Sequence, residues 1–441
     1  MKARFLIAVL LWLPIQTGVR AASLETILDT TLQKNPAIQQ AKLNLEQAAG
    51  DRLVLRSVVW PGLRANIPAG IQGGHRGGSN SIKAFGFVRG AFTQPLFNAA
   101  IPASLRRGDI DLLIAEQQLN VAVVEQLHAA RLAFYSALYN RQLLSLRQTQ
   151  RQRLNENVSS EENRYRAGLT DRSAVTGATV QAHDLDSQIE GARRDYGAAQ
   201  LKLAEAIGSD LGQSANHLPE PEGDLQFAPV AVDLNAETES ALERRTDVKL
   251  ARLLVRAANE DERIIAAGYY PVVNGTVTAD YIPVTGIHRE GSTSRTQDFI
   301  GSEIREGATL TWLIIDSGKT TGAVIKQRKA REVNEAECRK LEANVARELS
   351  RIRNELESIE GREKSLAAAT NAAEQDVTTI KQNLGSGLSS ELEYRLAENS
   401  YLQTKTGLVD AAYLYNVALA EWDRATGRYF QFSEDTAQNV H

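Results

Sequence analysis

Hydrophobic positions along the chain switch between a helical spacing and a strand spacing, and the order of these segments is the first clue to the fold. From residue 24 to about residue 59, apolar residues recur every three or four positions, which predicts a helix with one buried face. Asn35-Pro36 predicts a break near its start. After Trp60-Pro61-Gly62, apolar and polar residues alternate from Leu63 to Gln72, as expected for a strand with one apolar face.

A second strand and a second hairpin follow the same alternation. A glycine-rich segment, Gly73 to Asn80, is predicted to be a flexible loop. The strand after it runs from about Ile82 to Phe97, so the first hairpin covers about residues 62–97. A second hairpin covers about residues 272–315, with a long polar loop between Pro283 and Ser302. Any one of these runs could belong to a soluble β-sandwich, but four runs in two hairpins favour the wall of a transmembrane barrel.

Each hairpin is followed by a very long helical segment. The first covers residues 99–166. The second carries a coiled-coil seam of apolar residues spaced by four and three, namely Val345, Leu349, Ile352, Leu356 and Ile359. At ~1.5 Å per residue, a helix of about 65 residues is about 100 Å long, far beyond a globular domain. Each ends at a glycine turn, residues 166–170 or 385–389, after which Thr170 or Ser389 can cap a return helix.

The order of segments occurs twice because the chain contains a tandem repeat. Leu32 recurs as Leu242, 210 positions later, whereas Gly168 recurs as Gly387, 219 positions later. The difference between the two offsets places about nine extra residues in the second hairpin. We therefore expect a first repeat (22–208), a linker (209–233), a second repeat (234–427) and a tail (428–441).

Residues 1–21 are predicted to be a secretory signal peptide. Lys2 and Arg4 precede an apolar stretch, and a small-residue exit ends at Ala21. About nine apolar residues are too few to span a bilayer, which needs about twenty. Loss of the three basic residues in this segment changes the net charge from −4 to −7, so composition gives no electrostatic case for nucleic-acid binding. The single cysteine, Cys338, excludes a disulfide within one chain.

The number of strands then limits the expected assembly. No stretch after the signal peptide has the apolar length of a membrane helix, so a membrane-spanning part must be a β-barrel. One chain supplies four strands, and two chains would give an eight-stranded barrel that side chains largely fill. Three chains would give twelve strands, with room for a water-filled lumen. A trimeric pore is the simplest assembly that these elements can build.

The duplicated order of elements and the turn Tyr165-Arg166-Ala167-Gly168-Leu169 resemble the TolC family of outer membrane efflux proteins, over essentially the whole mature chain. The resemblance implies a mixed α and β membrane protein. Its expected form is a trimeric channel-tunnel with a 12-stranded β-barrel, four strands per protomer, and a long periplasmic α-helical barrel of coiled-coil hairpins. Such a homotrimer lies among the lipids of the outer membrane of a Gram-negative bacterium. It is a passive conduit that works with a periplasmic adaptor and an inner-membrane transporter of the RND or ABC type, in efflux or type I secretion.

The resemblance also implies two sites. The helix tips match the turns where family members meet the adaptor, although their glycines could serve only to end the helices; these tip residues are Gly168, Leu169, Thr170, Gly387, Leu388 and Ser389. In TolC, acidic residues six and nine positions after the second tip glycine narrow the periplasmic entrance. Glu393 and Leu396 occupy those positions here, and Ser389 replaces the arginine that helps latch the closed state in TolC. We therefore expect one acidic ring of Glu393, with Glu391 beside it, unless Glu393 only faces solvent.

A girdle of aromatic side chains is expected where the strands meet the membrane surfaces, formed by Trp60, Phe92, Phe97, Tyr270, Tyr281 and Trp312. The sequence contains no nucleophile–base set, metal-ligand spacing or cofactor motif, so we expect neither catalysis nor a cofactor. The alternative function is an exported coiled-coil structural or adhesion-type protein without channel activity. It would share the heptads, but it would not need alternating strands.

Overall fold

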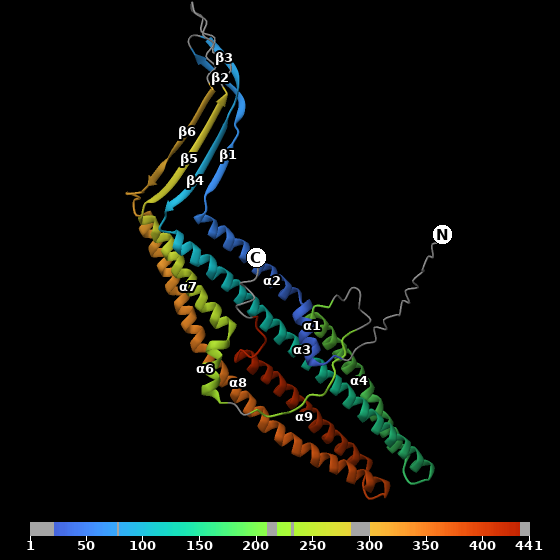
Figure 1. Cartoon of the computed structure of the whole chain (residues 1–441). Coiled ribbons are helices and arrows are strands. Elements are labelled where there is room, and N and C mark those ends of the chain that lie inside the picture. Colours follow the sequence, from blue (N-terminus) through green and yellow to red (C-terminus); the bar gives the residue numbers. More distant parts are fainter. Residues whose placement is uncertain (1–21, 77–78, 210–217, 231–232, 284–299, 433–441) are drawn as a thin grey trace, which may run out of the picture. The chain divides into compact units, whose positions relative to one another are not determined.

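The computed structural model describes residues 22–76, 79–209, 218–230, 233–283 and 300–432 (Figure 1). The predicted signal peptide, residues 1–21, therefore lies outside the described residues. Each repeat begins with two short helices and one turn of 3-10 helix. These are α1 (Leu24–Lys34), α2 (Pro36–Arg56) and η1 (Ser57–Val59), then α6 (Leu234–Arg244), α7 (Thr246–Ala266) and η2 (Ala267–Tyr269).

The break predicted at Asn35-Pro36 is confirmed. Asn35 has an extended backbone that ends α1, and its Oδ1 accepts a hydrogen bond from the backbone N of Ala37, 2.9 Å away, at the start of α2. Because proline lacks a backbone N–H, Pro36 fits the first helical position without losing a hydrogen bond. Arg245 occupies the same place between α6 and α7.

The strands form one antiparallel sheet with a two-stranded extension. The sheet has the order β1-β4-β5-β6, and β2 pairs with β3. The strands are β1 (Gly62–Asn66), β2 (Ala69–Arg76), β3 (Ser79–Gly86), β4 (Val88–Phe97), β5 (Val272–Pro283) and β6 (Ile300–Thr311). A hydrogen bond of 3.1 Å from the N of Phe87 to the O of Pro68 joins the two sections, so β1–β2 and β3–β4 follow two continuous paths. The protomer thus has four strand paths, as the sequence predicted.

The glycine-rich segment is not the loop that we expected from Gly73 to Asn80. Gly73 pairs with Ile82 and Gly74 with Ser81, so β2 and β3 extend through most of it, and only residues 77–78 lie outside the described residues. The prediction was wrong because a β ladder needs backbone N–H and C=O groups, which glycine supplies as well as any residue does. Both ends of the loop predicted from Pro283 to Ser302 are likewise strand, since Pro283 pairs with Ile300 and Ser302 pairs with Tyr281; residues 284–299 lie outside the described residues.

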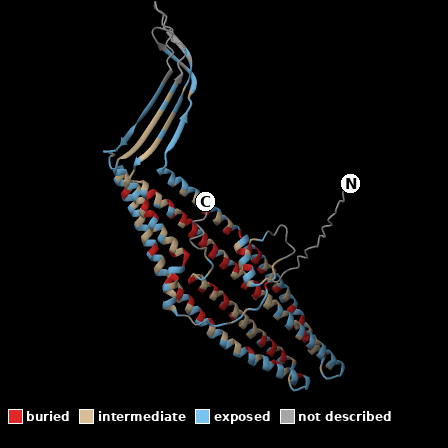
Figure 2. Cartoon of the chain, viewed as in Figure 1, coloured by how far each residue is buried: buried red, intermediate tan, exposed pale blue. Residues whose placement is uncertain are grey.

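Many residues of the sheet are exposed in the protomer (Figure 2), and several of these exposed residues are apolar. They include Leu63, Ile304 and Leu310. None of the described helices combines the length and the hydrophobicity needed to cross a membrane.

Two helical hairpins follow the strands. They are α3 (Ile101–Arg166) with α4 (Arg172–Ile207), and α8 (Lys319–Gly385) with α9 (Glu391–Ala425). The predicted seam is confirmed, because Val345, Leu349, Ile352, Leu356 and Ile359 are all buried. The chain forms two compact units, and each unit draws on both repeats. The described parts of residues 1–40, 121–245 and 344–431 form the first unit, and those of 41–120, 246–343 and 432–441 form the second.

The repeat is visible in contacts as well as in residue identities. Gly208, at the end of α4, lies against Asn35, and Gly427, at the end of α9, lies against Arg245. Asn35 donates a hydrogen bond of 2.9 Å to the O of Ala206, and Arg245 donates one of 3.2 Å to the O of Ala425. These positions differ by the same 210 and 219 residues that the sequence shows. At these two junctions, equivalent positions of the two repeats therefore make equivalent contacts.

One equivalent pair has its charges reversed. In the first copy, Arg52 of α2 contacts Asp109 of α3 at 2.7 Å. In the second copy, Glu262 of α7 contacts Arg328 of α8 at 3.0 Å. Each short helix is thus fastened to the long helix of its own repeat by an ion pair at the same place.

Candidate functional site

The tip of the first hairpin is a tight turn held by backbone hydrogen bonds. Gly168 has a φ of +72°, a left-handed conformation that L residues rarely adopt. The N of Leu169 donates to the O of Arg164, and the N of Gly168 to the O of Tyr165, both at 2.9 Å. This pattern gives partners to the carbonyls of Arg164 and Tyr165 in the last turn of α3. Asp171 caps α4, accepting from the N of Ala174 at 3.0 Å, so the expectation that Thr170 is the cap was wrong by one residue.

The tip of the second hairpin has the same geometry. Gly387 has a φ of +74°, and the N of Leu388 donates to the O of Asn383 at 2.8 Å. The N-cap of α9 is Ser390 rather than the expected Ser389. In both copies the turn needs one more extended residue than we assumed before the next helix can begin, so the cap moves one position later.

The apolar tip residues are open to solvent in the protomer. Leu169 is 71% exposed and Leu388 is 79% exposed. Apart from the adjoining residues of the chain, nothing lies within 4 Å of the position that a Cβ would take on Gly168 or on Gly387, while Thr170 and Ser389 are half-buried. Each hairpin therefore presents one exposed leucine next to a left-handed glycine that has open space at its Cβ position.

The two carboxylates expected at the constriction have different surroundings. Glu393 is exposed, and its Oε2 accepts from the N of Ser390 at 2.7 Å, while its own N donates to the Oγ of Ser390 at 3.2 Å. This capping box holds the start of α9. Glu391 is half-buried and accepts from the Nδ2 of Asn157 on α3 at 2.8 Å. Burial raises the pKa of Glu391, and the neighbouring Glu161 raises it further. Of the two, Glu393 has the freer access to ions.

A buried polar contact between α3 and α9 was missed by the sequence reasoning. Glu398 is almost fully buried, accepts from the hydroxyl of Tyr394 at 3.0 Å, and lies 3.8 Å from the guanidinium of Arg153. The guanidinium of Arg153 also lies over the ring of Tyr401, 5.0 Å from its centroid. The spacing of Tyr394, Glu398 and Tyr401 was a sign of this contact, because it places a carboxylate on the packed face of a helix.

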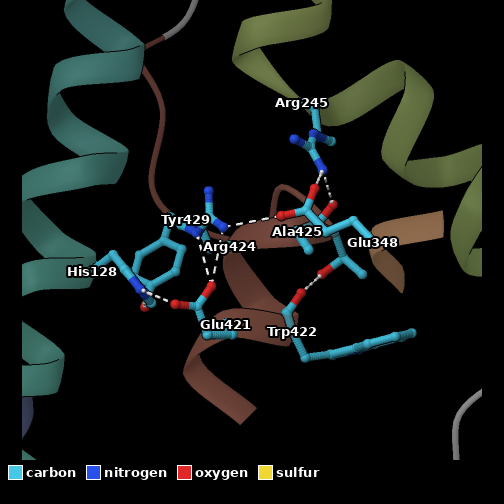
Figure 3. A network of polar contacts seen from close by, with 9 residues as sticks. His128, Arg245, Glu348, Glu421, Trp422, Arg424, Ala425 and Tyr429 are labelled. Carbon is cyan, nitrogen blue, oxygen red and sulfur yellow. Dashed lines mark hydrogen bonds and ion pairs between the residues drawn. The ribbon is translucent and has the colours of Figure 1, made fainter. Parts of the chain in front are cut away.

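A second polar network surrounds His128 on α3 (Figure 3). Its Nε2 lies 3.1 Å from a carboxylate oxygen of Glu421, and its Nδ1 lies 3.1 Å from the hydroxyl of Tyr429. Because a carboxylate only accepts, Nε2 carries the proton and Nδ1 accepts from the tyrosine. Burial lowers the pKa of His128, although Glu421 opposes this shift, so the neutral ring is favoured at neutral pH.

The network continues to α8 and to the end of α6. Arg424 contacts Glu421 and Glu348, each at 3.0 Å, and Glu348 also contacts the buried Arg245 at 2.6 Å. These charged groups are paired with one another within the protomer (Figure 3). We therefore assign the network to fixing the helices rather than to binding a solute.

Four of the six predicted girdle residues gather at one end of the sheet. Trp60 precedes β1, Phe97 ends β4, Tyr270 precedes β5 and Trp312 follows β6, and the strand register places these ends together. The Nε1 of Trp312 donates to the O of Tyr269 at 3.2 Å, which fixes its ring at this end. Phe92 lies further along β4, beside Leu63 and Val277, and Tyr281 lies nearer the other end of β5, beside Val88. All six side chains are exposed in the protomer.

Among the described residues, no group of three His, Cys, Asp or Glu side chains is placed to hold a metal ion. The positions that remain as candidates are the two exposed tips, Glu393 and the apolar sheet.

Comparison with known proteins assigns both repeats to one family. The family model described as outer membrane efflux protein matches residues 27–209 and 238–428. A comparison with curated protein sequences found no significant match.

Three solved structures with a similar fold are described as outer membrane proteins or channels. The outer membrane protein VceC of Vibrio cholerae is 17% identical, with a TM-score of 0.74, over 92% of this chain and 96% of that one. The CmeC outer membrane channel of Campylobacter jejuni is 13% identical, with a TM-score of 0.79, over 95% and 88%. The MtrE outer membrane channel of Neisseria gonorrhoeae is 17% identical, with a TM-score of 0.74, over 92% and 88%. At these identities the likeness shows the fold, and it confirms the predicted fold class.

Proposed function

We propose, from the premise that this chain belongs to the outer membrane efflux protein family, that it is the passive outer membrane conduit of a tripartite export system. The observation that carries the proposal is the family match across both repeats. Family membership agrees with the resemblance and with the outer membrane location expected from the sequence. Proteins of this family transport rather than catalyse, and they work as homotrimers with an adaptor and an inner-membrane pump. We assign energy coupling to that pump, which is of the RND or ABC type.

The sheet supports the membrane part of the proposal. Its two edges are β1 and β6, whose outer backbone groups have no partner strand among the described residues. Such edges pair readily with another chain. Three copies would supply twelve strand paths and leave no edge. The exposed apolar side chains of the strands would then face lipid.

The proposal is tested by extracting the protein in detergent, measuring its oligomeric mass and recording its conductance in a planar bilayer. We expect a trimer that forms water-filled channels. A water-soluble monomer without conductance would overturn the proposal and would favour the exported coiled-coil alternative.

We propose that the two tips dock the adaptor, and this can be tested with substitutions of Gly168 and Gly387. Both glycines have open space where a Cβ would lie, so a bulky side chain fits without disturbing the packing of the hairpin. Gly168→Trp and Gly387→Trp should abolish export while the trimer remains intact. Gly168→Ala is the matched control, since it imposes the same left-handed strain, about 1–2 kcal/mol, without the bulk. Normal export by both Trp variants would exclude the tips as docking points.

We propose that Glu393 sets the ion preference at the periplasmic entrance. Glu393→Gln should weaken the preference for cations, because glutamine retains an acceptor for the capping box but removes the charge. Glu391→Gln should change selectivity less, since Glu391 is half-buried against Asn157. Reversal potentials measured across a salt gradient distinguish the two variants. If Glu393→Gln leaves the reversal potential unchanged, Glu393 does not line the ion path.

A further inference from the structure

One face of α2 is open although the equivalent face of α7 is packed. On α7, Leu250, Leu253 and Ala257 pack against Ile110 and Ile114 of α3. The positions of α2 that correspond to Leu250, Leu253 and Ala257 are Gln40, Leu43 and Gln47, and all three are exposed. Leu43 is 63% exposed, and nothing lies within 4 Å of the Cβ position of Gly50 on the same face. The second repeat therefore covers this face of its short helix α7, whereas the first repeat leaves the equivalent face of α2 uncovered.

The face of α8 that corresponds to the packed face of α3 is also open. Ile114 of α3 corresponds to Val333 of α8, which is 55% exposed. Arg106 corresponds to Ile325, which is exposed as well. The chain therefore has two open faces, one on α2 and one on α8. They are the counterparts of the faces of α7 and α3 that already contact each other.

The charges of the two open faces match. Within the chain, Arg107 of α3 contacts Asp261 of α7 at 2.8 Å. By the same offsets, Arg107 corresponds to Lys326 of α8 and Asp261 corresponds to Asp51 of α2. The equivalent pair again consists of one cation and one anion. Both are exposed, and neither makes an ion pair within the described part of the chain. One apolar pair of the α7–α3 contact is also retained, because Leu43 takes the place of Leu253 while Val333 takes the place of Ile114.

In the compact unit that contains residues 41–120 and 246–343, the helices lie in a row, and the two open faces belong to the first and last helices of this row. Arg52 joins α2 to α3, Arg107 joins α3 to α7, and Glu262 joins α7 to α8. Since α2 and α8 are the ends of this row and both end faces are exposed, the chain does not close the row on itself. A second molecule of this chain can add its α8 to this α2, and such head-to-tail contacts generate a ring when the rotation from one molecule to the next closes.

We propose that the α2 face of Leu43, Gly50 and Asp51 binds the α8 face of Ile325, Lys326 and Val333 in a second copy of this chain. The contact reproduces between chains the α7–α3 contact within one chain. The proposal rests on the proposed function, since it assigns residues to the interface of the homotrimer.

The other compact unit supplies an independent pair. There, Asn157 of α3 donates to Glu391 of α9. The equivalent positions are Asp376 of α8 and Arg172 of α4, which are exposed, oppositely charged and without an ion pair among the described residues. If contacts between the two repeats of one chain are repeated between neighbouring chains, Asp376 of one chain contacts Arg172 of the next.

Cysteine cross-linking tests the register of the interface. In full-length Cys338→Ala protein in outer membranes, Leu43→Cys combined with Val333→Cys should give disulfide-linked trimers after oxidation, because a disulfide needs Cα atoms about 4.4–6.8 Å apart. Each single-cysteine variant should give none. Leu43→Cys combined with Lys326→Cys is the matched control, since Lys326 lies seven residues, or about 10 Å, further along the helix. Cross-linking by the control pair but not by the proposed pair would overturn the register.

A charge exchange provides a second readout that does not depend on cysteine. Asp51→Lys places like charges opposite each other, so it should lower the fraction of trimer in detergent, and Lys326→Asp should do the same. The double variant should restore the trimer, which a general folding defect would not do. If the double variant is no better than the single ones, Asp51 does not meet Lys326. If the unmodified protein is not a trimer, the proposed function itself fails; if it is a trimer with neither result, only this interface is wrong.

Discussion

Gly208→Ala is expected to destabilise the protein far more than Gly168→Ala, although both glycines have a left-handed backbone. The φ of Gly208 is +80° and that of Gly168 is +72°, so an alanine at either position carries a similar strain of about 1–2 kcal/mol. Only Gly208 is also enclosed by backbone. Its Cβ would lie 2.8 Å from the Cα of Asn35 and 2.9 Å from the O of Lys34.

Relief of that clash requires the junction of α1 and α2 to move away from the end of α4, and overpacking of this kind costs a further 1–3 kcal/mol or so. We therefore expect Gly208→Ala to lose about 2–5 kcal/mol in all. The apparent melting temperature and the rate of native-state proteolysis in detergent measure the difference. Similar losses for Gly208→Ala and Gly168→Ala would contradict the close approach of Asn35 to Gly208.

Arg245→Ala is expected to produce the second large loss of stability. Arg245 is 7% exposed, contacts Glu348 at 2.6 Å and donates to the O of Ala425 at 3.2 Å (Figure 3). Without the Arg245 side chain, the O of Ala425 in the last turn of α9 loses this donor. The partly buried carboxylate of Glu348 loses one of its two cationic partners and keeps Arg424. Breaking one side of a buried pair costs about 3–5 kcal/mol, and the partial exposure of Glu348 places the expected loss near the lower end, about 3 kcal/mol.

Two further variants serve as controls for the loss of stability in Arg245→Ala. Arg244→Ala should change the melting temperature little, because Arg244 is exposed. Arg245→Asn should be intermediate, since the first copy has Asn35 at this position and uses its amide to reach the O of Ala206. An Arg245→Ala protein as stable as Arg244→Ala would show that the ion pair with Glu348 contributes nothing net.

Local patterns in the sequence predicted much of the fold. The helix break at Asn35, the buried seam of Val345 and Leu349 and the left-handed glycines of both tips depend on neighbours within a few residues. The spacing of apolar residues and the residue types at the helix ends indicate such features directly. The errors were also local: the caps at Asp171 and Ser390 lie one residue beyond the expected ones.

The contacts that the sequence did not predict join residues far apart in the chain. Arg153 and Glu398 are 245 positions apart, and nothing in a single sequence aligns α3 with α9 to bring them within 3.8 Å. Glu391 and Glu393 were expected to act together because they are close in sequence. Residues two positions apart on a helix point in different directions, however, so one carboxylate reaches Asn157 while the other returns to Ser390.

The reversed ion pair has a consequence for how the duplicated chain folds correctly. The two copies are similar enough that α7 could compete with α2 for the flank of α3 during folding. In that arrangement Glu262 would meet Asp109, and α2 on α8 would place Arg52 against Arg328. Both mispaired forms bring like charges together, whereas both native pairings are attractive. The opposite polarity of the two pairs thus distinguishes each repeat from its duplicate and disfavours the exchange of helices between them.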